Sequence, residues 1–116
     1  MSLRLVSVLD RGVPNKERVL ISVVRNVDLK YYVLVDATQV PGGVIPGSLA
    51  AFWFTTKQVR EGDTIVVYTG SGQANVSPQP NGHTVHFYYW GRPQTVFTAP
   101  SRAAVLFELQ NWTTAL

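Results

Sequence analysis

Residues 83–93 read HTVHFYYWGRP, a run that holds both histidines of the chain and four consecutive aromatic residues. In an extended strand, successive side chains point to opposite faces. His83 then shares a face with Phe87, whereas His86 shares the other face with Tyr88. Histidines on opposite faces cannot bind one metal ion, and their spacing matches no zinc motif. The run predicts a strand with one set of rings in a core and the other set left for a partner.

The rest of the chain repeats this pattern of short apolar runs rich in Val, Ile, Tyr, Phe and Thr, separated by turns that contain Gly and Pro. No segment has the apolar spacing of a long helix. The predicted strands are Leu3–Leu9, Arg18–Arg25, Lys30–Asp36, Leu49–Phe54, Thr64–Thr69, His83–Trp90 and Ala103–Gln110, with a weaker candidate at Thr95–Phe97. Strands of this number and spacing indicate one all-β domain over residues 1–116, either a sandwich or a small barrel.

Two connections between predicted strands are long, Thr38–Ser48 and Gly70–Gly82, and loops of this length tend to be functional or mobile. Alternation along the strands also predicts which side chains are buried. The expected core residues are Val19, Ile21, Val23, Tyr31, Val33, Val35, Ile65, Val67, Val105 and Phe107.

The composition limits the classes of partner. Ten basic and seven acidic residues give a net charge of +3, and only 15% of the 116 residues are charged. The basic residues are dispersed singly, whereas a groove that follows phosphates has clustered positive charge. No cysteine is present, which excludes disulfides, thiolate zinc sites and thiol nucleophiles. The low charge leaves a large neutral surface for association.

The chain begins MSLRLVSVLD, which alternates polar and apolar residues and lacks the organisation of a secretory signal peptide. No run of about 18 apolar residues occurs, so we expect no membrane-spanning helix and no membrane partner. These features predict synthesis in the cytoplasm. For a structural protein, assembly into a virion is then expected to follow synthesis.

Catalytic motifs are absent from the sequence. Gly70-Ser71-Gly72 is not followed by a helix, as a nucleophile elbow would be, and it lacks the lysine of a phosphate-binding loop. Asp36 and Asp63 lie at strand ends, where turns and caps account for them. We therefore predict that the protein is not an enzyme and has no catalytic residue, no metal site and no cofactor.

The second half of the chain also contains a series of motifs. A turn ending in glycine precedes a Val-rich strand, and an aromatic-Gly step, a short aromatic strand and a closing strand with an acidic residue follow. These motifs are Glu61-Gly62-Asp63, Ile65-Val66-Val67, Trp90-Gly91, Phe97 and Val105-Leu106-Phe107-Glu108. Together with KYYVLVDAT at Lys30–Thr38, the series resembles the lamin-tail domain family over roughly residues 18–110. Thr98–Arg102 departs from the family's Asn/Asp/Gly-rich turn.

The resemblance implies an immunoglobulin-like β-sandwich of seven or eight short, mostly antiparallel strands, and a non-catalytic module. We expect a structural protein that contacts copies of itself or a larger assembly such as a capsid. The specific form of this expectation is a phage-type virion subunit that decorates or cements the capsid, an analogy without a motif. The predicted partner contacts are Trp53, Tyr88, Trp90, Arg92 and Trp112.

Two other functions remain open at this stage. The aromatic run beside Arg92 combines rings with a cation, as in small β-barrels that bind single-stranded nucleic acid. Because alternation divides Phe87 and Tyr89 from Tyr88 and Trp90, at most two of these four rings share one platform. The other function is a carbohydrate-binding β-sandwich, which rests on the aromatic content alone.

Overall fold

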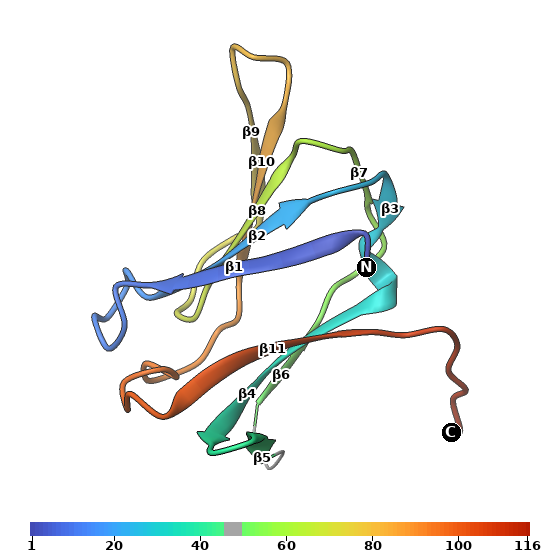
Figure 1. Cartoon of the computed structure of the whole chain (residues 1–116). Helices are drawn as coiled ribbons and strands as arrows, with labels where there is room; N and C mark the ends of the chain where they lie inside the picture. Colours follow the sequence, from blue (N-terminus) through green and yellow to red (C-terminus); the bar gives the residue numbers. More distant parts are fainter. Residues whose placement is uncertain (46–49) are drawn as a thin grey trace.

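The computed structural model describes residues 1–45 and 50–116, which form an all-β, sandwich-like fold (Figure 1). The strands are β1 (Leu3–Leu9), β2 (Arg18–Val23), β3 (Val27–Asp28), β4 (Tyr32–Val40), β5 (Gly43–Ile45), β6 (Ala51–Trp53), β7 (Gln58–Val59), β8 (Thr64–Tyr68), β9 (Asn75–Pro78), β10 (Thr84–Tyr89) and β11 (Arg102–Glu108). A single 3-10 turn, Leu29–Tyr31, leads into β4. In the part of the chain that the structure describes, no helix is long and apolar enough to cross a membrane.

Two larger sheets make up the layers. The first sheet has the order β1-β2-β8-β10-β9, and the second has the order β11-β4-β5, with β6 also paired to β4. Figure 1 shows the first sheet above the second, with the β9–β10 hairpin projecting at the top of the view. Most pairs are antiparallel, but β8 and β10 run parallel. The small β3–β7 pair connects the layers at one end.

The predicted strands are confirmed with small shifts at their ends, except that Thr95–Phe97 is not a strand. Both predicted long connections contain strands that the sequence pattern did not show. β5 lies within Thr38–Ser48, and β9 lies within Gly70–Gly82. The predicted loop Thr38–Ser48 ends at Ser48, and the predicted strand Leu49–Phe54 begins at Leu49. Both of these end residues lie outside the described residues.

The predicted core is confirmed in the first sheet, where Val19, Ile21, Val23, Ile65 and Val67 are all buried. It is wrong in the second sheet. There the core contains Tyr32, Leu34 and Leu106, and the alternate set points outward. The residues wrongly assigned to the core are Val33, Val35, Val105 and Phe107. Tyr31, which precedes β4, is partly buried and packs against the core.

The error has a physical cause in β4, whose residues 32–35 are all apolar. Alternation predicts which side chains share a face, but it cannot choose the buried face when both faces are apolar. Apolar residues on both faces are characteristic of strands that are covered on both sides. The second sheet of this protein has such a strand but only one covered face.

Rings fill the space between the layers. Phe54 contacts Phe52 at a centroid distance of 5.0 Å and Tyr88 at 5.2 Å, in both cases edge to face. Trp90 lies 6.2 Å from Phe52 and 6.3 Å from Phe97. Edge-to-face pairs at such distances contribute about 0.5–1.5 kcal/mol beyond the area they bury. Half of the aromatic run 87–90 therefore belongs to the core.

Glu17 is a buried carboxyl group that joins three distant segments. Its side chain is 1% exposed, and its two oxygens accept hydrogen bonds from the backbone N–H groups of Gly12 (2.8 Å), Val96 (2.6 Å) and Phe97 (3.1 Å). The Thr69 hydroxyl donates a fourth bond of 2.8 Å. The segment after β10 thus obtains partners for its backbone donors without forming a strand.

Asp63 is a second buried carboxyl group, at the start of β8. It accepts hydrogen bonds from the backbone N–H groups of Arg60 (3.1 Å) and Thr84 (3.0 Å), and it lies 2.9 Å from Nε2 of His86. Burial alone raises the pKa of Asp63, but the bonds from His86, Thr84 and Arg60 outweigh burial and hold this pKa below its usual value.

Candidate interaction surface

The outer face of the second sheet is apolar and free of charged side chains over its central rows. Register aligns Trp53, Val33 and Phe107 in one row across β6, β4 and β11, and aligns Ala51, Val35 and Val105 in the next. We call these six residues the tryptophan face. Trp53 is 48% exposed and Phe107 is 46% exposed. A continuous apolar patch of this kind usually marks an interaction site on a soluble protein.

Trp53 is held in place on this face by contacts within the chain. Its indole Nε1 donates a 2.8 Å hydrogen bond to the carbonyl oxygen of Lys30. Trp112, from the segment after β11, packs edge to face against Trp53 at 5.3 Å and against Tyr31 at 5.8 Å. The Lys30 ammonium lies 5.3 Å from the centre of the Tyr31 ring. Trp53 is therefore an oriented, half-exposed ring, as interface anchors commonly are.

A chain shortened to end at Asn111 loses the Trp112 contacts. We expect its free energy of unfolding to fall by about 1–3 kcal/mol, since two edge-to-face pairs are lost and each contributes about 0.5–1.5 kcal/mol. Trp53 fluorescence should shift to longer wavelength and become easier to quench with iodide as water reaches the ring. Urea unfolding and quenching measure both effects. A chain ending at Trp112 is the matched control, and equal behaviour of the two chains would contradict the role of Trp112.

The predicted partner contacts separate in the structure. Trp53 and Trp112 lie together at the tryptophan face, and Trp112 is 39% exposed. Tyr88 and Trp90 are buried at 8% and 9% exposure, so the structure corrects their assignment from partner contacts to core residues. Alternation does place the rings of β10 and Trp90 on two faces. The face with Tyr88 and Trp90, which was predicted to contact a partner, packs inward.

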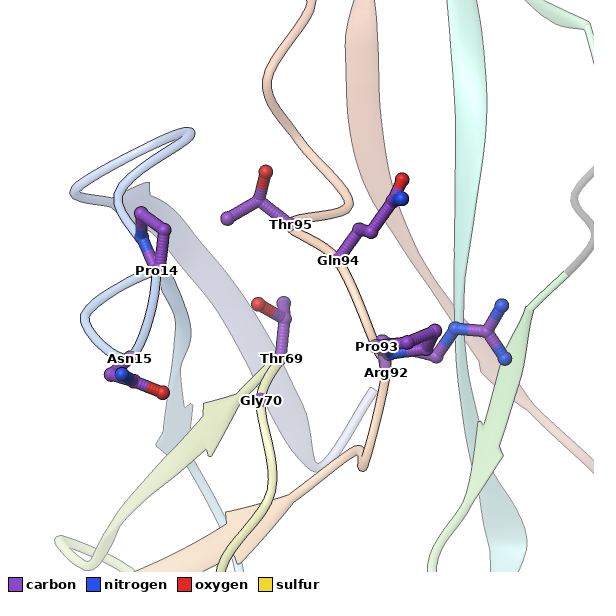
Figure 2. A pocket seen from close by; sticks show the side chains of 8 residues that line it. All are labelled: Pro14, Asn15, Thr69, Gly70, Arg92, Pro93, Gln94 and Thr95. Atoms are coloured by element: carbon purple, nitrogen blue, oxygen red, sulfur yellow. The ribbon is translucent and has the colours of Figure 1, made fainter.

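Arg92, the fifth predicted contact, lies beside a pocket of about 370 Å³ that contains none of the other predicted contacts (Figure 2). The pocket is bordered by Pro14, Asn15, Thr69, Gly70, Arg92, Pro93, Gln94 and Thr95. Figure 2 shows the Arg92 guanidinium extending away from the other side chains. The remaining side chains are proline rings together with amides and hydroxyls, of which only the amides and hydroxyls can form hydrogen bonds, and none supplies an acid or base at neutral pH.

The two histidines have separate environments. His86 is 5% exposed and faces Asp63, whereas His83 is exposed and lies against Gly62, where an added Cβ would come within 2.3 Å of its ring. Over residues 1–45 and 50–116, no three His, Asp or Glu side chains gather where they could hold a metal ion. The only histidine–carboxylate pair in these ranges is buried and joins His86 of β10 to Asp63, the residue before β8.

The outward rings of the first sheet form a stack of their own. Tyr68 and Tyr89 lie 5.3 Å apart with an angle of 12° between their planes, and the Arg18 guanidinium lies 5.9 Å from the Tyr68 ring centre. A Cβ at Gly72 would come within 2.5 Å of the Tyr89 ring, so the backbone there lies against that ring. The ring faces are thus covered within the chain, which disfavours base stacking. The strands also belong to separate sheets and do not close into one ring.

Comparison with protein-family models, curated proteins and solved structures found no match for this chain. The resemblance to lamin-tail domains therefore remains an expectation. Sequence reasoning missed Phe107, which it placed in the core, and Glu17, which it did not single out. No sequence signal places Phe107 outside the core, because β11 is apolar on both faces; only the register of β11 against β4 sets Phe107 beside Val33 and Trp53.

Proposed function

We propose that the protein is a non-catalytic structural module that binds other protein subunits through the tryptophan face. The observation that carries this proposal is the row Trp53, Val33 and Phe107, in which two half-exposed rings flank a valine on an uncharged sheet face. Aromatic anchors surrounded by apolar side chains supply most of the energy of protein interfaces. A subunit that decorates or cements a virus capsid is the specific form we favour, because such subunits act by contact alone.

Sedimentation of the protein in extracts of its native source tests this function. We expect the wild-type chain to sediment with a large particle, and Trp53→Ser to reduce the particle-bound fraction at least about tenfold, as loss of an interface anchor does. Tyr89→Ser is the matched control, because it removes an aromatic ring from the outer face of the other sheet. A wild-type chain found only as free, low-mass protein would overturn the proposal, as would equal effects of the two substitutions.

A further inference from the structure

Within residues 1–45 and 50–116, strand β11 lies at an edge of the second sheet and pairs only with β4. It is seven residues long, and in the same ranges β1, the nearby edge strand of the other sheet, pairs only with β2. A long edge strand presents a row of backbone N–H and C=O groups that can pair with another strand. Natural edge strands usually carry Pro, inward-pointing Lys or a bulge that prevents such pairing. In β11 the residues from Ala103 to Phe107 are all apolar.

Hydrogen bonds at both ends of β11 show which of its backbone groups face outward. Leu109 N–H donates to the Tyr31 carbonyl, and Gln39 N–H donates to the Ser101 carbonyl, each at 2.7 Å. In an antiparallel pair, the residues that bond to the partner alternate with residues that point their groups away. The odd-numbered residues of β11 thus bond to β4, and the even-numbered residues from Arg102 to Glu108 face the open edge. The Arg102 carbonyl does so, since it accepts a 2.8 Å bond from the Arg11 side chain.

The backbone groups and apolar side chains along this edge are complementary to the same edge of a second copy. β11 begins at Arg102, whose side chain pairs with Asp36 and whose carbonyl accepts from Arg11, and it ends at Glu108, which accepts from the Tyr32 hydroxyl. An antiparallel pair centred on Val105 sets Arg102 opposite Glu108 of the partner subunit, and sets Ala104 opposite Leu106 of the partner subunit. Both pairs are even-numbered, so outward donors meet outward acceptors. The same register joins Val105 and Phe107 of each copy into one apolar face across the two sheets.

We infer that the chain forms a twofold-symmetric dimer by antiparallel pairing of β11 with β11 of a second copy, centred on Val105. A second copy of the chain is therefore one partner for the proposed function. The inference rests on that proposed function, because it treats the molecule as an assembly module. The contact is isologous, so it closes at two subunits. The dimer carries two tryptophan faces on one continuous sheet, which would let it contact a larger assembly at two points and bind more tightly than either face alone.

Charge reversal at the symmetry axis tests this register. Val105 is half-buried on the outer face, so a charged residue fits there without entering the core. We expect wild-type protein to show a dimer fraction that rises between about 1 and 100 μM in analytical ultracentrifugation, as small interfaces do. Val105→Lys and Val105→Glu should each raise the dissociation constant at least about tenfold, because like charges then meet across the axis. An equimolar mixture of the two variants should recover dimers that contain one chain of each kind.

Val44→Lys is the matched control, since Val44 is 43% exposed and lies in β5, at the side of β4 opposite β11. This variant should dimerise as the wild type does, and circular dichroism should show that all variants fold. A monomeric wild type, unchanged dimerisation of Val105→Lys, or a mixture that fails to associate would each overturn the dimer. A monomer that still joins particles overturns only the dimer, whereas a dimer that never joins a particle overturns only the proposed function.

Discussion

Glu17→Ala should lower the free energy of unfolding by about 3–5 kcal/mol, a loss as large as that expected from truncating a buried ring of the core. The change leaves the backbone N–H groups of Gly12, Val96 and Phe97 and the Thr69 hydroxyl without their shared partner in a site where the side chain is 1% exposed. Each buried donor left unpaired costs about 1–3 kcal/mol. Total stability of a domain is only about 5–15 kcal/mol, so the variant should be partly unfolded near 37 °C.

Urea unfolding followed by tryptophan fluorescence measures this loss. Glu17→Gln is the informative companion, because it preserves the shape but turns an amide N–H₂ toward backbone donors, so its loss should lie between the wild type and Glu17→Ala. Glu61→Ala, at an exposed turn, is the control and should change stability by less than about 0.5 kcal/mol. A loss below about 1 kcal/mol for Glu17→Ala would show that water replaces the carboxyl oxygens, and would contradict the assigned role.

Asp63→Asn should reduce stability by about 2–3 kcal/mol at pH 7, and by less as the pH falls below the usual pKa of an aspartate, about 3.9. The folded protein holds the pKa of Asp63 below its usual value, which is about 3.9 in unfolded chains. Its ionised form therefore stabilises the fold above that pH, and the stabilisation disappears as the pH falls through the lower, folded pKa. Asparagine does not titrate, so the difference between the two proteins should narrow over this acidic range.

Unfolding in urea at pH 7, 5, 3 and 2 measures how the difference in free energy of unfolding between the wild type and Asp63→Asn decreases with pH. Glu61→Gln changes a carboxyl group two residues away that is exposed, and it should follow the wild type at every pH. Acidic groups that do not contact Asp63 have the same surroundings in wild type and variant, so their titration cancels in the difference. A gap that stays constant with pH would mean that Asp63 contributes through packing and neutral hydrogen bonds rather than through its charge.

Strand positions were predictable because Gly- or Pro-containing turns clearly separate the apolar runs of this chain. Alternation also predicts that Trp53 lies on the face opposite to Phe52 and Phe54, but it did not decide that this face is the exposed one. The buried face of β4 was not predictable, because Val33 and Leu34 are equally apolar and only packing chooses between them. For the same reason, the sequence did not indicate that Tyr88 and Trp90 point inward while Phe87 and Tyr89 point outward.

Glu17 illustrates a different limit. Its donors at Val96 and Phe97 lie 79 and 80 residues later in the chain, in a segment without regular structure. No local pattern connects a glutamate in a turn with backbone groups so distant, and a charged residue beside Lys16 and Arg18 reads as solvent-exposed. Long-range polar contacts of this kind become visible only once the sheets are assembled.

The pairing of β4 with β11 also constrains when the protein can fold. In this pairing, Tyr32 of β4 lies opposite Glu108, and Thr38 lies opposite Arg102. β4 therefore cannot complete its pairing until residues 102–108, which are synthesised much later, are available. While a ribosome is still producing residues 50–100, β4 lacks that neighbour. Contacts this distant slow folding, and unpaired apolar strands are prone to aggregate meanwhile. We therefore expect the nascent chain to depend on chaperones until its last strand emerges.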